Sequence, residues 1–240
     1  MASITQRATD LAANVFTSSV SVDAIRLLSP SFRRIELVGS SLDGVSAKVG
    51  DKVQLRTGGL TFRTYTPISV ADGRLSFLAY GHGATTTPAA LLLDSLRVGD
   101  ELQVFGPRSS IDLGALGVAP IFVGDETSFG LAAAWVASVD ETTAARAVLL
   151  FEVVDLVEAA TVLDGLGIGA AQLAPSAVGG SDQLVERVVA ALSAAPAAPL
   201  VLTGRAQTIK AIRARVKDEQ LRPPTTIVKS YWDEHRAGLD

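Results

Sequence analysis

The chain has 240 residues, 48% of them hydrophobic, and a net charge of −4 at pH 7, which fits one large domain or two small ones. It contains no cysteine and only two histidines, so disulfides, iron–sulfur clusters, thiolate zinc sites and a cysteine nucleophile are excluded. We therefore expect no metal site, and any redox chemistry would use a bound organic cofactor. The acidic balance argues against a nucleic-acid partner.

Up to residue 115, the sequence is typical of short strands separated by turns. In 32–38, the apolar Ile35 and Leu37 alternate with charged residues, which is the period of a half-buried strand. The strands that we predict are 19–28, 32–38, 52–56, 62–68, 74–80 and 101–105. A helix over 88–96, with Pro88 in its first turn, interrupts them. This order predicts a six-stranded antiparallel β-barrel.

From residue 116 on, near-continuous apolar runs alternate with segments of helical period, as expected of strands that are buried on both faces. The predicted strands are 119–124, 145–154, 170–173, 199–203 and 225–231, and the predicted helices are 127–139, 156–163, 182–194 and 206–217. Such alternation predicts a parallel sheet with crossover helices. We therefore expect two domains, an antiparallel β-barrel over 1–115 and a parallel-sheet α/β domain over 116–240.

Neither a secretory signal nor a membrane span is expected. Residues 1–20 lack a basic region followed by an apolar block. The longest uncharged apolar run, 188–204, contains two prolines, whereas a span needs about 20 unbroken apolar residues. We expect a cytoplasmic protein, and the sequence leaves its oligomeric state open, a monomer included.

The segment 63–69, Arg-Thr-Tyr-Thr-Pro-Ile-Ser, is the sharpest motif of the first half. Strand alternation puts Arg63 and Tyr65 on one face. An arginine there can hold a diphosphate by forked hydrogen bonds, while the phenol packs on a ring and Thr66 offers a hydroxyl to a ring nitrogen. The residues alone equally fit an ordinary barrel strand with one surface arginine.

This Arg-x-Tyr-Thr-Pro-x-Ser pattern resembles the flavin-binding signature of the ferredoxin–NADP reductase superfamily. Four further segments follow in order: 80–90, which opens the helix, Gly106-Pro107, Gly124-Asp-Glu-Thr-Ser128, and Tyr231-Trp232. Together they resemble the siderophore-interacting protein family of FAD-dependent ferric-siderophore reductases, over about residues 20–238.

The resemblance implies FAD as the cofactor, with an FAD-binding barrel and an NAD(P)H-binding α/β domain. It implies NADPH or NADH as the electron donor and a small-molecule ferric siderophore as the substrate. It implies catalytic roles for Tyr65, Thr66 and Trp232. The cofactor-binding positions that it implies are Arg63, Tyr65, Thr66, Ser69, Tyr80, His82, Gly83, Thr85, Thr86, Thr87, Asp125, Thr127, Ser128, Gly204, Arg205, Tyr231 and Trp232.

Several of these positions have a plainer explanation from the residues alone. The loop before the helix can cradle a diphosphate at the helix N-terminus or be only a hydroxyl-rich N-cap, and His82 can touch FAD or be exposed. Asp125 and Glu126 are unfavourable directly beside a diphosphate, and Asp125 or Thr127 can simply cap a core helix. Trp232 can stack on the flavin or plug the core.

The nucleotide side leaves the coenzyme open. Thr203 stands where other superfamily members often carry cysteine, so a thiol-assisted hydride step is excluded. Arg205 can bind a ribose phosphate or cap its sheet edge. Glu152 and Asp155, but no arginine, accompany the strand 149–154, and this pattern does not favour NADPH over NADH.

We interpret the chemistry as hydride transfer from NAD(P)H to flavin, followed by single-electron transfer to Fe(III). The flavin converts a two-electron donor into one-electron steps, so no protein nucleophile or acid–base pair is needed. Two alternatives remain: a flavin reductase that supplies a partner protein or free flavin, and a non-catalytic flavin-binding or siderophore-binding module.

Overall fold

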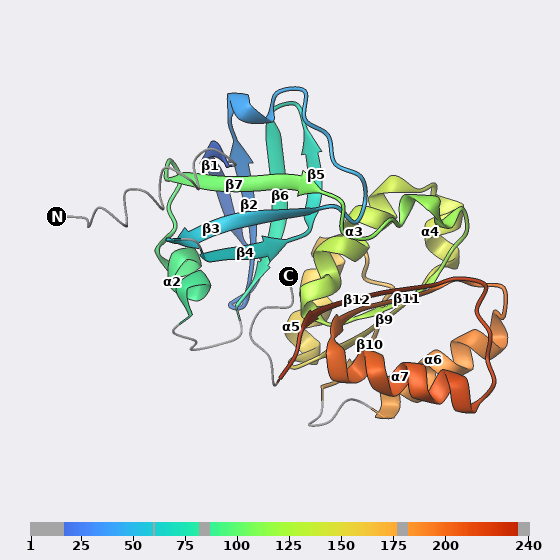
Figure 1. Ribbon diagram of the computed structural model, residues 1–240. Helices are drawn as coiled ribbons and strands as arrows, with labels where there is room; N and C mark the ends of the chain where they lie inside the picture. The colour runs from blue at the N-terminus through green and yellow to red at the C-terminus, as the bar shows by residue number, and fades with distance from the viewer. Residues whose placement is uncertain (1–16, 60, 82–86, 177–181, 235–240) are drawn as a thin grey trace. The chain divides into compact units, whose positions relative to one another are not determined.

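The computed structural model describes residues 17–59, 61–81, 87–176 and 182–234 (Figure 1). The chain divides into two compact units, residues 1–112 and 113–240. The sequence places the boundary after residue 115. Each unit has its own sheet and its own hydrophobic core.

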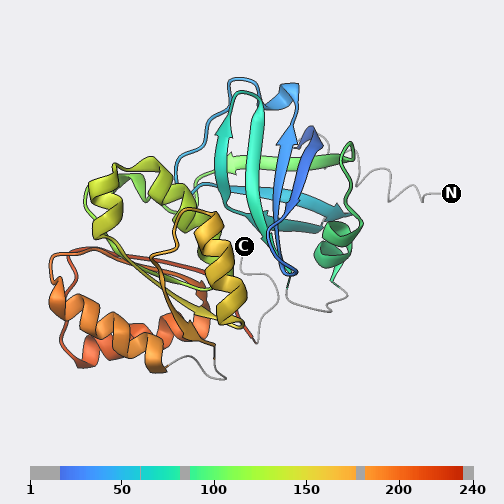
Figure 2. The ribbon, with the colours of Figure 1, turned by 180° about the vertical axis from the view of Figure 1, so that it is seen from behind.

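The first unit is built on one antiparallel sheet of seven strands, in the order β4-β3-β7-β1-β2-β6-β5. The strands are β1 (Ser18–Leu27), β2 (Phe32–Val38), β3 (Lys52–Gly58), β4 (Thr61–Tyr65), β5 (Pro67–Ala71), β6 (Arg74–Tyr80) and β7 (Glu101–Arg108). A short 3-10 helix, η1 (Ser40–Leu42), follows β2. Figure 2 shows how strongly the strands curve around one another.

The prediction of six strands is wrong by one, because the predicted strand 62–68 divides at Thr66. Thr66 lies between β4 and β5, which are the two outer strands of the sheet order. Because the two edges are consecutive in the chain, they meet at this residue, and the sheet rolls into a barrel there. The ring of Tyr65 on β4 lies 4.6 Å from that of Phe77 on β6, across this seam.

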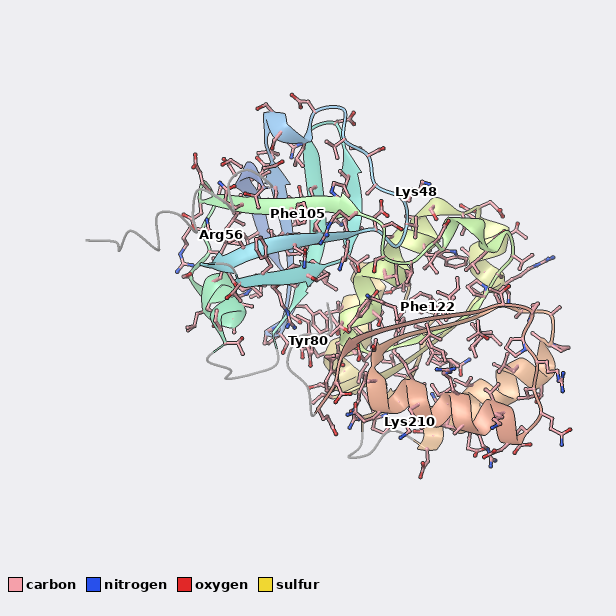
Figure 3. The ribbon with its side chains drawn as sticks, viewed as in Figure 1. Lys48, Arg56, Tyr80, Phe105, Phe122 and Lys210 are labelled. Carbon is pink, nitrogen blue, oxygen red and sulfur yellow. The ribbon has the colours of Figure 1, made fainter. Side chains whose placement is uncertain are left out.

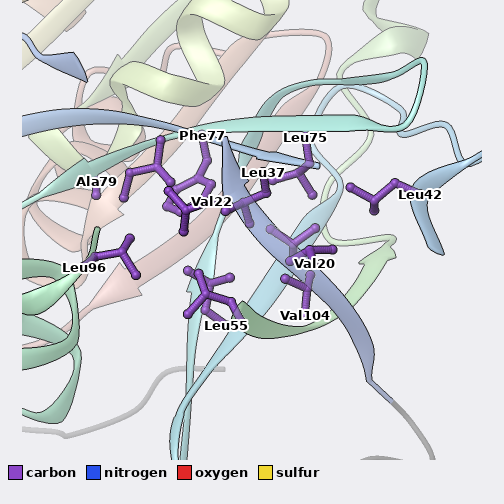
Figure 4. Packing of buried hydrophobic residues seen from close by; sticks show 13 residues of the cluster. Val20, Val22, Leu37, Leu42, Leu55, Leu75, Phe77, Ala79, Leu96 and Val104 are labelled. Atoms are coloured by element: carbon purple, nitrogen blue, oxygen red, sulfur yellow. The ribbon is translucent and has the colours of Figure 1, made fainter. Parts of the chain in front are cut away.

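The barrel core follows the predicted alternation. Ile35 and Leu37 of β2 are fully buried, whereas the charged residues beside them are not. Figure 4 shows the cluster that fills the barrel, with contributions from β1, β2, β3, β6 and β7. The helix α2 (Pro88–Ser95) packs on this cluster through Leu92 and Leu93, and Arg33 of β2 binds Asp94 at 2.9 Å.

The second unit has an all-parallel sheet of five strands in the order β10-β9-β8-β11-β12. The strands are β8 (Ile121–Gly124), β9 (Val148–Val153), β10 (Gln172–Pro175), β11 (Leu200–Arg205) and β12 (Thr226–Trp232). The three central strands are buried along nearly their whole length, which explains their continuous apolar runs. Phe122, labelled in Figure 3, belongs to β8.

Helices cover both faces of this sheet, as Figure 1 shows. They are α3 (Phe129–Ser138), α4 (Glu141–Arg146), α5 (Leu156–Gly165), α6 (Asp182–Ala194) and α7 (Ala206–Asp218), with the 3-10 helices η2 (Gly114–Leu116) and η3 (Glu126–Ser128). Leucine, valine and isoleucine of α6 and α7 form one core with β8, β9 and β11. On the other face, Phe129 of α3 packs edge-on against Phe151 of β9, with ring centroids 5.0 Å apart.

The expected fold class, an antiparallel barrel followed by a parallel-sheet α/β unit, is confirmed. The helix α4 was not predicted. Asp140 marks its start by accepting a hydrogen bond from the Thr143 amide at 2.9 Å. In the part of the chain that the structure describes, no helix is long and apolar enough to cross a membrane.

Candidate functional site

In the barrel, the predicted flavin residues Arg63 and Tyr65 lie on one face of β4. Arg63 pairs with Leu55 of β3 and Tyr65 pairs with Val53, and both β3 residues point into the core. Directly paired residues of antiparallel strands point to the same side. Arg63 is nevertheless exposed, because β4 is the edge strand at the seam.

The phenol of Tyr65 is held in an apolar setting. Its ring packs on Phe77 and against the barrel cluster. Burial raises the pKa of Tyr65 to about 12, and the Arg63 guanidinium opposes that rise. The phenol therefore stays protonated at neutral pH, and the Arg63 charge lies close enough to act on it.

Ser69 and Tyr80 belong to the outward face of the barrel. The Ser69 hydroxyl lies 2.9 Å from that of Ser76, which alternates on β6 with the core residue Phe77. Tyr80 packs its ring against Phe32, with centroids 4.7 Å apart. Ser69 and Tyr80 therefore each contact a neighbouring side chain of the barrel.

The loop that precedes α2 is described only at its ends. Thr87 is the N-cap residue of α2, and its hydroxyl accepts a hydrogen bond from the Ala90 amide at 3.3 Å. The helix packs beside β3, the neighbour of β4. The predicted contacts at His82, Gly83, Thr85 and Thr86 lie outside the described residues.

In the α/β unit, the predicted residues gather at the carboxyl ends of β8, β11 and β12, and Asp125 is at their centre. The residue is 2% exposed. It accepts hydrogen bonds from the Thr127 amide at 2.9 Å, from the Thr127 hydroxyl, and from Nε1 of Trp232 at 2.7 Å. Burial raises the pKa of Asp125 to about 6, and these hydrogen bonds limit the rise.

Two glycines make room for this arrangement. Gly204 has φ +92°, and a Cβ built on it would lie 2.5 Å from Oδ2 of Asp125. A Cβ on Gly124 would lie 2.4 Å from Cβ of Ser128. The Ser128 hydroxyl in turn accepts a hydrogen bond from Thr203 at 2.8 Å, so Thr203 has a packing role here. Both glycines therefore accommodate the protein's own side chains.

Glu126 also points inward. Its carboxylate accepts a hydrogen bond from the Val154 amide at 2.6 Å, and the residue is 8% exposed. Burial raises its pKa to about 7, and Asp125 and Glu152 add to that rise. The two acids that are unfavourable beside a diphosphate are thus both engaged within the α/β unit.

Arg205 is the buried cation of this edge, at 3% exposure. It forms ion pairs with Glu152, at 3.6 Å, and with Glu234, and its guanidinium lies 5.6 Å from the ring centre of Trp232. A ribose phosphate would have to compete with Glu234 for it. Glu152 also accepts a hydrogen bond from Thr208.

The last residue of β12 and the two residues after it are each held by a side chain from another segment of the unit. Asp125 binds Trp232, Gln207 binds Asp233 at 3.2 Å, and Arg205 binds Glu234. We call these six residues, Asp125, Arg205, Gln207, Trp232, Asp233 and Glu234, the C-terminal clasp. Tyr231, beside Trp232 on β12, is half-buried.

Three members of this site were not predicted from the sequence: Gln207, Asp233 and Glu234. Gln207 follows the predicted site residue Arg205 in the first turn of α7, and the other two follow Trp232 directly. Their closeness in the sequence to Arg205 and Trp232 was therefore the only local indication that they belong to the site. Their pairing joins segments 26 and 29 positions apart, which no local pattern shows.

No protein-family model matches the sequence, and no curated protein matches it either. The class of fold is nevertheless defined: an antiparallel barrel and a parallel α/β unit also make up a ferredoxin–NADP⁺ reductase variant from Plasmodium falciparum. That structure matches with a TM-score of 0.66 at 13% identity, over 90% of this chain and 96% of that one.

Two further solved structures are those of siderophore-handling proteins. The siderophore-interacting protein from Acinetobacter baumannii matches with a TM-score of 0.73 at 15% identity, over 92% of both chains. A siderophore utilization protein from T. fusca matches with a TM-score of 0.71 at 22% identity, over 93% of this chain and 95% of that one. The two-domain fold that the motif resemblance implies is thus confirmed.

Proposed function

We propose that this chain is an FAD-dependent NAD(P)H oxidoreductase that reduces ferric siderophores. The observation that carries the proposal is the pairing of an exposed Arg63 with a packed Tyr65 on one face of the barrel seam. This pairing occurs in a chain with the fold of ferredoxin–NADP⁺ reductases.

The residues at the seam suit FAD. Arg63 offers a fork of donors and a full charge to a diphosphate, and Tyr65 offers a neutral aromatic ring fixed by Phe77. Thr66, between the two edge strands, offers a hydroxyl. The N-terminus of α2, beside β3, adds backbone donors for an anion. When bound, FAD supplies hydride acceptance and single-electron donation.

The α/β unit is the proposed receiver of NAD(P)H, since parallel sheets bind ligands at the carboxyl ends of their strands. At this edge, the backbone amides of Thr127 and Ser128 already donate to Asp125. The inward acids leave the half-exposed Thr127 side chain and the half-buried aromatic residues Tyr231 and Trp232 to meet the coenzyme. We propose that Trp232 gives way to the nicotinamide ring.

The overall reaction balances without a protein nucleophile. One NAD(P)H supplies two electrons, which reduce two ferric ions, and one proton is released. The ferrous ion has a lower charge than Fe(III) and binds catecholates and hydroxamates less tightly, so reduction frees the iron. The ferric siderophore is the substrate in this scheme.

An anaerobic titration of the purified protein with NADPH, and separately with NADH, tests whether the coenzyme reduces the bound flavin. Bleaching of a flavin spectrum by either coenzyme is expected. A protein that takes up no added FAD would refute the flavin assignment. A flavin that neither coenzyme reduces would instead favour the binding-module alternative.

The reduction of the ferric siderophore is tested by adding ferric catecholate or ferric hydroxamate complexes together with a colorimetric Fe(II) trap. Two trapped Fe(II) ions per NAD(P)H are expected. If free flavin or an electron-accepting protein is reduced but neither chelate releases iron, the activity is that of a flavin reductase. That result would overturn the siderophore assignment alone.

A further inference from the structure

The orientation of Trp232 is set by side chains far from it in the sequence. The indole Nε1–H of Trp232 donates to Asp125 at 2.7 Å, and Arg205 lies over the indole ring. The next two residues, Asp233 and Glu234, are bound by Gln207 and Arg205. Three consecutive residues are thus each fixed by a separate contact.

The Asp125 carboxylate performs two tasks at once. Its Oδ1 accepts hydrogen bonds from the amide and the hydroxyl of Thr127. Asp125 is thereby the N-cap residue of η3, and these bonds fix the orientation of its carboxylate. Its Oδ2 is thereby aimed at the indole of Trp232. Because the group is 2% exposed, water does not compete for either oxygen. A charged acceptor in such surroundings binds more strongly than a neutral one.

We propose that Asp125 is a positioning residue that holds the Trp232 indole in one orientation, with Arg205 and Gln207 fixing the turn behind it. The clasp keeps the aromatic ring at the carboxyl edge of the sheet and opposes its displacement. This inference is independent of the proposed function in its structural part. Its consequence for coenzyme binding rests on that function.

The hydrogen bond weakens when Asp125 takes up a proton. Burial raises the pKa of Asp125 to about 6, so the carboxylate is charged above that pH and neutral below it. Among the residues that the structure describes, the other charged groups at this edge are Glu126, Glu152, Arg205, Asp233 and Glu234. The signal of the Trp232 indole proton should therefore follow a titration near pH 6.

The chain has only two tryptophans, so the indole N–H signals in a ¹H–¹⁵N spectrum of the full-length protein are simple to assign with Trp135→Phe. Trp135, on α3 and 2% exposed, is an internal reference. The wild-type Trp232 signal should shift with a midpoint near pH 6. In Asp125→Asn it should lose that titration, and its hydrogen exchange at pH 7.5 should speed up about tenfold to hundredfold.

Asp140→Asn is the matched control. Asp140 caps α4 by accepting from the amide and hydroxyl of Thr143, as Asp125 does from Thr127, but it binds no tryptophan in the described structure. It should leave the Trp232 signal unchanged. Glu126→Gln should leave the midpoint near pH 6, which separates the two neighbouring acids.

An unchanged Trp232 titration and exchange rate in Asp125→Asn would overturn the proposal. If that variant does not fold, the wild-type protein decides the matter: a Trp232 indole proton that exchanges at pH 7.5 as fast as that of a free indole is not held by Asp125, which also overturns the proposal.

The functional consequence has its own readout. Asp125→Asn and Trp232→Ala should both lower the NAD(P)H concentration for half-maximal flavin reduction, and the double variant should add little to Trp232→Ala. Full additivity would overturn the functional consequence. If no flavin binds, the proposed function fails, yet the spectroscopic result stands by itself.

Discussion

Glu126 should make the stability of the α/β unit fall as the pH rises from 4.5 to 7. Its pKa is raised from 4.5 to about 7, chiefly by burial. Because the folded state holds the proton over this window and the unfolded state does not, raising the pH removes stability. At 1.36 kcal/mol per pKa unit, the loss is about 3 kcal/mol.

Glu126→Gln isolates this contribution. The amide oxygen of glutamine still accepts the hydrogen bond that the Val154 amide gives to Glu126, while the ionisation is gone. The variant should gain on the wild type by about 3 kcal/mol in free energy of unfolding between pH 4.5 and pH 7.5. Any constant offset from the altered contact cancels in that difference.

The assay is urea unfolding at a series of pH values, followed by tryptophan fluorescence. Both tryptophans belong to the α/β unit, so the signal reports the unit that contains Glu126. Glu141→Gln, at an exposed glutamate in the first turn of α4, is the control for a lost negative charge. Parallel stability curves for the wild type and Glu126→Gln would refute the reasoning.

Three further substitutions test FAD binding by the barrel and the packing of the α/β unit. Arg63→Ala should weaken FAD binding about tenfold to hundredfold, measured as flavin retained on gel filtration, because a charge-assisted contact is lost; Arg26→Ala, on a well-exposed arginine of β1, should retain it. Gly204→Ala should cost about 3 kcal/mol of unfolding free energy in urea, because its φ is +92° and the new Cβ meets Asp125. Trp135→Ala should cost about 4 kcal/mol in the same assay by opening a cavity in a fully packed core, and a loss below 1 kcal/mol would contradict that packing.

The fold was predictable from the sequence where the hydrophobic periodicity of a single helix or strand is enough to identify it. The strand 32–38 was predicted with its observed bounds, because its alternation is local. The helix 182–194 was predicted equally well from its period. The division at Thr66 was not predictable in this way, since it depends on two edge strands meeting after the sheet has curved. The helix α4 was missed because its six residues are too few to show a period.

In the candidate site, the sequence predicts which charged residues are present but not the direction in which their side chains point. Asp125 and Glu126 in the sequence suggest an acidic, solvent-facing edge that would repel a diphosphate. In the structure, the two carboxylates turn inward, to Trp232 and Thr127 and to the Val154 amide. Residue types alone state which charges are present, whereas the direction of each side chain decides which of them a ligand meets. Because the acids are used internally, their presence does not argue against a nucleotide at this edge.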